Sequence, residues 1–151
     1  MSSSEDFIGT GLAFPLHVNS TGNVALVSRE REIEESIALI LGTAPGERPL
    51  RPEFGCAIHD YVFAPADAAT AGEMADAVRR ALLRWEPRIE VGNVVVSPDP
   101  HNHSLLYVDV GYRIRHTNDP RNLVFPFYVI PDHGTPDAAF QTEVDPAAWE
   151  V

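Results

Sequence analysis

The pattern that most constrains this chain is an amphipathic helix that runs directly into three strand-like segments. Met74, Val78, Ala81, Leu82 and Trp85 recur at helical spacing. Thr70 and Glu73 match a capping box and predict that the helix begins near Thr70, and Pro87 predicts that it ends just before that residue. A helix followed at once by strands favours a domain in which the helix covers one face of a sheet.

The three strands are predicted over residues 91–97, 105–115 and 122–130. In the middle strand, alternation places an apolar set on one face and a charged set on the other: Leu106, Val108, Val110, Tyr112 and Ile114 against Asp109, Arg113 and Arg115. The turn signal Asn118-Asp119-Pro120 predicts that the last two strands form an antiparallel hairpin.

A second helix is expected to begin after Ser28, a candidate N-cap, and to end at Gly42. Within it, Ile33, Ile37, Ile40 and Leu41 form one stripe. Residues 7–27 predict short extended segments or an irregular hairpin. The predicted fold is therefore α+β: two helices packed on a small mixed or antiparallel sheet with a C-terminal β-hairpin. We expect a flexible N-terminus over residues 1–8, one domain over 9–131 and an acidic, flexible tail over 132–151.

The formal net charge is −11, and all 11 basic residues are arginines. Nucleic acids and anionic membranes bind proteins mainly through Lys and Arg, so this balance argues against both partners. No segment approaches the ~18 apolar residues of a membrane span, and the polar first residues lack the features of a secretory signal. We expect a soluble protein without membrane insertion.

Three groups of residues invite a chemical interpretation, and none of them is specific. His101 and His103 share a strand spacing but fall in a polar stretch typical of a loop. Cys56 and His59 are close in sequence only, and a small buried cysteine is the simpler interpretation. The sequence therefore predicts no catalytic residue, no metal site and no cofactor.

Carboxylates for glycoside hydrolysis are the third group. Glu47, Glu53, Asp60 and Glu86 are available, but the sequence does not bring any two of them into a cleft. In a chain with 22 acidic residues, some pair will always be available.

The segment Trp85-Glu86-Pro87-Arg88-Ile89 stands out for its charges. Glu86 would sit at the negative end of the helix dipole, which disfavours it by about 0.3–1 kcal/mol. Pro87 fixes the corner and gives the planar guanidinium of Arg88 a defined direction. Two interpretations remain: a solvated ion pair at a helix stop, or a pair that binds another protein. If both charges are exposed, replacing either should change stability by no more than about 0.5 kcal/mol.

A set of motifs follows a fixed order over residues 9–130: Gly11 with Phe14-Pro15-Leu16, the stripe from Ile33 to Leu41, Thr43 with Gly46-Glu47-Arg48, Pro52 with Phe54-Gly55, Trp85 to Ile89, and the strand from Asn122 to Ile130. This ordered set resembles one family, the small sheath-initiating baseplate wedge subunits of contractile injection machines, some of which are labelled tail lysozymes.

The resemblance implies a structural subunit that is assembled in the bacterial cytoplasm and resides in the baseplate of a phage tail or tail-like particle. Its implied partners are baseplate wedge proteins, sheath subunits and, as further candidates, inner tube or spike-hub proteins. The implied contact residues are Glu86, Pro87, Arg88, Glu47, Arg48, Phe54, Phe125, Phe127 and Tyr128. The alternative is a tail lysozyme that degrades cell wall.

The last predicted strand fits a sheath-templating role. It is apolar on both faces, yet Pro126 in its middle cannot donate a ladder hydrogen bond. Both features are satisfied if the strand lies at a sheet edge and a partner covers its outer face, as strand addition requires.

Overall fold

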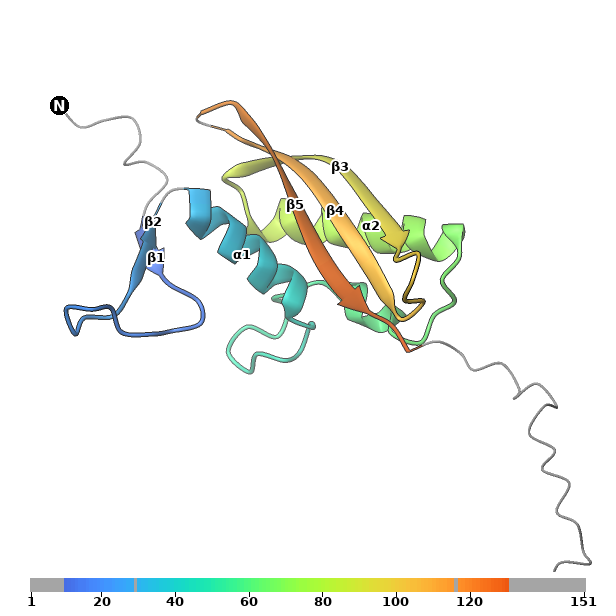
Figure 1. Cartoon of the computed structure of the whole chain (residues 1–151), viewed down its shortest axis with the longest axis horizontal. Helices are drawn as coiled ribbons and strands as arrows, with labels where there is room; N and C mark the ends of the chain where they lie inside the picture. Colours follow the sequence, from blue (N-terminus) through green and yellow to red (C-terminus); the bar gives the residue numbers. More distant parts are fainter. Residues whose placement is uncertain (1–9, 29, 116, 131–151) are drawn as a thin grey trace, which may run out of the picture.

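A computed structural model describes residues 10–28, 30–115 and 117–130 (Figure 1). Two α-helices, α1 (Glu30–Gly42) and α2 (Ala68–Trp85), pack on a sheet of β3 (Ile89–Pro98), β4 (Leu105–Ile114) and β5 (Asp119–Tyr128). A short 3-10 helix, η2 (Ala57–Tyr61), precedes α2. The α+β prediction is confirmed, and the sheet is wholly antiparallel in the order β3-β4-β5. The predicted N-terminal segment 1–8 and tail 132–151 lie outside the described residues.

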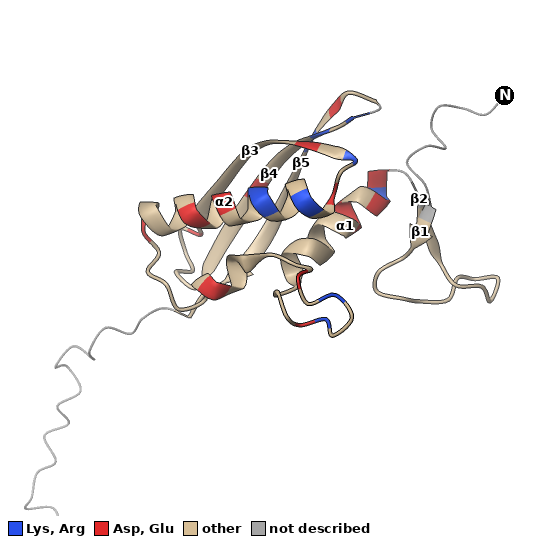
Figure 2. Cartoon of the chain, turned by 180° about the vertical axis from the view of Figure 1, so that it is seen from behind, with Lys and Arg blue, Asp and Glu red and all other residues tan. Residues whose placement is uncertain are grey.

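Both helices cover the same face of the sheet, which is plain when the chain is seen from behind (Figure 2). The core lies between the two layers and takes the predicted stripes of both helices. From β4 it takes Leu106, Val108, Val110, Tyr112 and Ile114, all buried as expected from the alternation. No helix of the described residues covers the opposite face of the sheet.

The start of α2 differs from the prediction. The helix begins at Ala68, and the side chain of Asp67 caps it by accepting a hydrogen bond of 2.8 Å from the backbone N–H of Thr70. Thr70 is therefore inside the first turn and is not the cap. A carboxylate at this position also suits the positive end of the helix dipole.

The hairpin between β4 and β5 is tighter than predicted. Ile114 pairs with Asp119, so Asp119 and Pro120 belong to β5 and only four residues connect the strands. Asn118 takes the positive φ that this turn requires. The register of β4 and β5 then runs without a shift to Leu105 and Tyr128, so β5, the edge strand of this sheet, has no bulge.

Residues 10–28 form the predicted irregular hairpin. Strand β1 (Thr10–Leu12) pairs antiparallel with β2 (Leu26–Ser28), and a bridge joins Val18 to Val24 farther along. This hairpin stands beside the start of α1 and does not join the main sheet (Figure 1). No helix within the described residues is long and apolar enough to cross a membrane.

The connection from α1 to η2 is an ordered loop held by its own backbone. The N–H of Cys56 donates to the carbonyl of Thr43 across the base of the loop, at 2.9 Å. Gly55, just before it, has a φ of +122°, and a Cβ there would lie 2.2 Å from the same carbonyl oxygen. Only glycine fits this position, because a side chain would meet backbone that cannot move aside.

We predict that Gly55→Ala lowers the free energy of unfolding by at least about 2 kcal/mol through steric overlap and backbone strain. Gly72→Ala is the matched control, since Gly72 lies in α2 with open space around it. That change should stabilise the protein by about 0.5–1 kcal/mol. Urea unfolding of both variants measures the difference, and an unaffected Gly55→Ala protein would contradict the assigned loop geometry.

Candidate functional site

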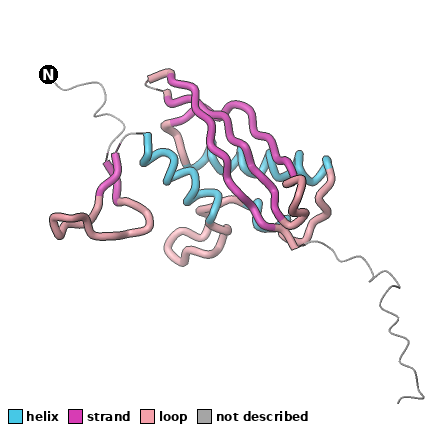
Figure 3. The backbone as a smooth tube through the Cα atoms, in the orientation of Figure 1, coloured by secondary structure: helices cyan, strands magenta, loops and turns pink. Residues whose placement is uncertain are grey.

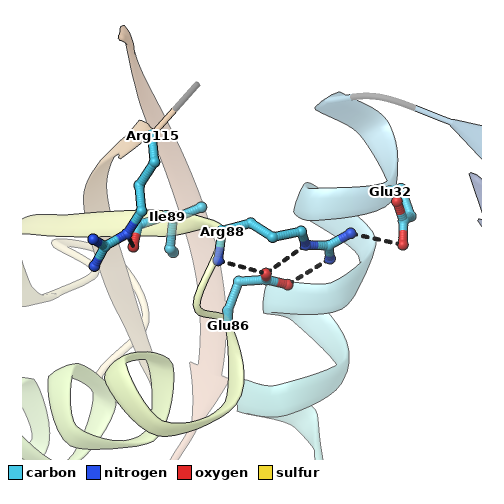
Figure 4. A network of polar contacts seen from close by, with 5 residues as sticks. All are labelled: Glu32, Glu86, Arg88, Ile89 and Arg115. Carbon is cyan, nitrogen blue, oxygen red and sulfur yellow. Dashed lines mark hydrogen bonds and ion pairs between the residues drawn. The ribbon is translucent and has the colours of Figure 1, made fainter. Parts of the chain in front are cut away.

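The corner between α2 and β3 holds the most buried charge among the described residues. Glu86 is the C-cap of α2, and its backbone N–H still donates to the carbonyl of Leu82 at 2.9 Å. Its side chain turns inward toward α1 and is only 2% exposed. Pro87 ends the helix, so the next residue begins the approach to β3 (Figure 4).

Arg88 binds this carboxylate through two nitrogen atoms of its guanidinium. Its Nε and Nη2 atoms donate to Oε1 and Oε2 of Glu86 at 2.6 and 2.7 Å, a bidentate pair. Its third nitrogen, Nη1, lies 2.9 Å from Oε1 of Glu32 on the first turn of α1. The guanidinium of Arg88, just before β3, thus contacts the end of α2 through Glu86 and the first turn of α1 through Glu32 (Figure 4). We call Glu32, Glu86 and Arg88 the corner triad.

The electrostatics of the corner triad follow from this geometry. Burial alone would raise the pKa of the Glu86 carboxyl, but hydrogen bonds from Arg88 and Ser36 and the charge of Arg88 outweigh it. The net result is a pKa below the ordinary value of 4.5. The pKa of Arg88 is raised, chiefly because Glu86 accepts its hydrogen bonds. The pair is therefore ionised at neutral pH.

The interpretation of this corner as a solvated ion pair is wrong, because Glu86 is buried. A carboxylate facing the negative end of a helix dipole needs a compensating cation, and Arg88 of the same chain supplies it. Sequence reasoning missed Glu32 and Ser36, which come from α1. The one available signal was their spacing of four residues, which places both on one side of the helix.

One acceptor in the triad remains open. The Oε2 atom of Glu32 is buried and accepts no hydrogen bond from the described residues. The carboxylate oxygen that lacks a donor is therefore on Glu32, whereas both carboxylate oxygens of Glu86 accept hydrogen bonds from Arg88.

Arg115 extends the corner to the turn of the β4–β5 hairpin. Its backbone N–H donates to the carbonyl of Arg88 and its Nε atom to the carbonyl of Ile89, both at 3.1 Å. Figure 4 shows the contact of Arg115 with Ile89 beside the triad. The corner therefore joins both helices to the start of β3 and the end of β4.

Two predicted contact residues of the 43–55 loop, Arg48 and Phe54, lie in a stack of side chains that ends next to the corner. The guanidinium of Arg48 lies 4.7 Å from the centre of the Phe54 ring, and that ring lies 5.2 Å from the ring of Trp85. The guanidinium of Arg84 lies 4.9 Å from the centre of the Trp85 ring and pairs with Glu53. Since Trp85 directly precedes Glu86, the stack couples the loop to the corner.

Glu47 does not belong to the stack. Its carboxylate accepts a hydrogen bond of 3.0 Å from the N–H of Ala44 and so closes a turn of its own loop.

The predicted contact residues of β5 divide by face. Phe125 and Phe127 point to the helices, where Phe127 is buried against His59 with ring centres 5.7 Å apart. Tyr128 points to the open face and is 65% exposed. These residues lie at the far end of the sheet from the corner, because Tyr128 pairs with Leu105 while Asp119 pairs with Ile114. Nine residue steps of strand correspond to about 30 Å.

The remaining chemical candidates are dispersed. Cys56 is buried, as predicted, and burial raises the pKa of its thiol. A ring nitrogen of His59 lies 2.8 Å from the carbonyl oxygen of Leu41, so that histidine is held by backbone. His101 and His103 lie in the exposed loop between β3 and β4. Over the described ranges, no three His, Cys, Asp or Glu side chains gather as metal ligands would.

Comparison with known proteins gives one consistent family. Residues 27–119 match the sequence model of the family described as baseplate wedge protein gp25. The baseplate wedge protein gp25 of Enterobacteria phage T4 is 34% identical over 76 residues, which are 50% of this chain and 58% of that protein. The matched part thus spans somewhat more than half the length of this curated relative.

Two solved structures have a similar fold. One, from Geobacter sulfurreducens and named a tail lysozyme, is 49% identical with a TM-score of 0.65, covering 70% of this chain and 96% of its own. The other lies in the baseplate of the anti-feeding prophage, with 21% identity and a TM-score of 0.63, covering 87% of this chain and 94% of its own. At that identity the second likeness concerns the fold alone.

We predict that Arg88→Ala lowers the free energy of unfolding at pH 7 by about 3–5 kcal/mol, because it leaves the buried Glu86 carboxylate without its cation. Arg79→Ala is the control. Arg79 lies on the exposed side of α2 with a looser pair to Asp76 at 3.7 Å, so its loss should change stability by no more than about 0.5 kcal/mol. Equal stability of the two variants in urea would show that the triad does not hold the fold.

The stabilising effect of Glu86 should also depend on pH in a defined direction. Its pKa is lower in the folded chain than in the unfolded one, so the unfolded state takes up the proton first as pH falls. The contribution is complete above the unfolded value of about 4.5 and declines as pH drops through the folded pKa. In Arg88→Ala this decline should be absent, so the stability difference between wild type and variant should shrink from pH 7 to pH 3.

Proposed function

The chain belongs to the baseplate wedge protein gp25 family, and we propose that it is a structural baseplate wedge subunit of a contractile injection machine. In this role the corner triad supports the contact with neighbouring wedge proteins, and the free edge of β5 pairs with a strand of the first sheath ring. Inner tube or spike-hub proteins are further candidate neighbours. The subunit would be assembled in the bacterial cytoplasm and would then reside in the baseplate of the particle.

The observation that carries the sheath contact is the backbone pattern of β5. In an antiparallel pair, opposed residues alternate between those that exchange hydrogen bonds and those whose backbone groups point away. Val129 extends the register of the hairpin, and its N–H donates to the carbonyl of Ser104 at 2.9 Å. Because this alternation repeats every two residues, the backbone groups of the odd-numbered residues of β5 bond to β4. The backbone groups of the even-numbered residues point to the free edge.

Both prolines of β5, Pro120 and Pro126, are even-numbered. Neither costs the sheet a ladder hydrogen bond, which resolves the conflict that Pro126 posed in the sequence. The free edge keeps the N–H groups of Asn122, Val124 and Tyr128. A strand that adds there must therefore place its acceptors opposite these three donors and tolerate a gap at each proline. This restriction gives the edge selectivity among incoming strands.

The two ends of this edge are bounded. Ile130 is also even-numbered, and its N–H already donates to the carbonyl of Val62 at 2.8 Å, so the chain itself covers the edge beyond Tyr128. At the other end the edge begins at the tight turn before Asp119. Within the described residues no strand pairs with β5 on this side. The available edge is about one ordinary strand long.

Side chains beside the edge support the same role. Val124 and Tyr128 are exposed on the face of the sheet that carries no helix, although each is large and apolar or aromatic. A partner strand, together with the residues that follow it, would cover them.

The alternative, a tail lysozyme, rests on the name of the relative from Geobacter sulfurreducens. Glycoside hydrolysis needs a carboxylic acid with a raised pKa that faces a second carboxylate across a cleft. Three of the four candidates do not fit: Glu86 has a lowered pKa, Glu53 pairs with Arg84 and Glu47 closes its own loop turn. A purified protein that clears peptidoglycan, with loss of clearing in a single Glu→Gln variant, would favour the lysozyme.

We predict that Val124→Pro leaves the domain folded and yields baseplates without sheath. The N–H of Val124 faces the free edge and not β4, and Pro126 already occupies an equivalent position. The change therefore removes one donor from the edge and no hydrogen bond between β4 and β5. Leu123→Pro is the matched control and should unfold the domain, since the N–H of Leu123 bonds to β4. Thermal melting of both proteins and electron microscopy of particles test this. Sheath of normal length on Val124→Pro particles would contradict strand addition.

We also predict that Tyr128→Glu produces baseplates without sheath, because it places a charge on the apolar patch beside the edge. Tyr128→Phe keeps the ring and should assemble normally. Since Tyr128 is 65% exposed, neither change should shift the melting temperature by more than a few degrees. Normal sheath on the glutamate variant would mean that this face is not part of the contact.

A further inference from the structure

The hairpin of residues 10–28, which we call the arm, has no role in the core. It contains no Asp, Glu, Lys or Arg, in a chain of which 22% is charged. In the tube view it stands at one end of the molecule, with long loops beyond its two short strands (Figure 3). A segment this poor in charge is unusual for a surface that faces only water.

The arm has its small residues inside and its large ones outside. Ala13, Ala25 and Val27 form its own small buried cluster. Six larger side chains are between 47% and 67% exposed: Leu12, Phe14, Leu16, Val18, Val24 and Leu26. Two pairs of them lie directly opposite across the hairpin, Leu12 with Leu26 and Val18 with Val24. Such an arrangement exposes most of the apolar surface that a free-standing hairpin would bury, and contiguous exposure of this kind marks interaction sites.

The arm is held in place on α1, so its outer surface is fixed. The N–H of Phe14 donates to the Glu35 carboxylate at 3.0 Å. Gly11 lies so close to Glu32 that a Cβ there would be 3.1 Å from the Oε1 atom, the atom that pairs with Arg88. The surface of the arm is therefore continuous with the corner triad. Preformed apolar surfaces bind with little loss of conformational entropy.

We propose that the arm docks on an uncharged, apolar surface of a different baseplate protein, beside the contact that the corner makes. This inference rests on the proposed baseplate role. The chemistry of the partner follows from the arm, because a charged partner surface would lose water at this contact and gain no opposite charge. A lipid surface fits less well, since the chain carries a net charge of −11 and the arm has no cation to meet lipid phosphates.

The test uses a strain whose own gene carries the double change Leu12→Gln and Leu26→Gln, which replaces one exposed cross-strand pair. Leu83→Gln is the matched control, because Leu83 is 58% exposed on α2, away from the arm. Purified particles are washed in 0.1 and 1 M salt, and the bound subunit is quantified. We expect the double variant to be retained at least tenfold less than wild type at both salt concentrations, and the control to be retained fully. Both purified proteins should melt at the wild-type temperature.

A photo-reactive amino acid at position 16 identifies what lies against the arm. The expected product joins this position to a peptide of another baseplate protein that is free of charged side chains at the attachment point. A product between two copies of this chain, or binding of the purified protein to phosphatidylcholine vesicles that the double variant loses, would overturn the proposal. So would full retention of the double variant. Absence of the wild-type chain from particles would instead contradict the proposed function itself.

Discussion

The buried pair of Glu86 and Arg88 is the contact on which the rest of the structure depends. It fixes the end of α2, the start of β3 and, through Glu32, the first turn of α1 around one guanidinium. A charge in this position is stabilising only when its partner is in place, because a buried carboxylate without a cation costs several kcal/mol. The corner thereby helps to set both helices on one face of the sheet, and within the described residues no helix covers the other face and no strand pairs with the outer edge of β5.

This arrangement separates the surfaces that a scaffold subunit needs. The corner and the arm lie at one end of the molecule, and the free edge of β5 runs from that end to Tyr128, about 30 Å of strand away. In the proposed role, a wedge protein at the corner and a sheath strand near Tyr128 would occupy opposite ends of the molecule. The backbone pattern of β5 also explains two prolines in one strand, since both fall at positions where the edge and not the ladder loses a donor.

Much of the fold could be predicted from the sequence, because helical and alternating patterns record which side chains face the core. The stripes of α1 and α2 and the buried face of β4 are where the patterns placed them. The cap of α2 was misplaced because Asp67 lies outside the capping-box pattern that Thr70 and Glu73 suggested. The burial of Glu86 could not be foreseen, since it depends on Glu32 and Ser36, which are about fifty residues away and belong to another helix. The exposed side chains of the arm follow a pattern that becomes informative only when the position of the core is known.

A cryo-electron microscopy map of the complete particle, resolved well enough to trace the backbone around β5, tests strand addition most directly. We expect a strand from a sheath subunit beside β5, accepting hydrogen bonds from the N–H groups of Asn122, Val124 and Tyr128 and passing Pro120 and Pro126 without bonds. A free edge in water, or one covered by a helix, would contradict it.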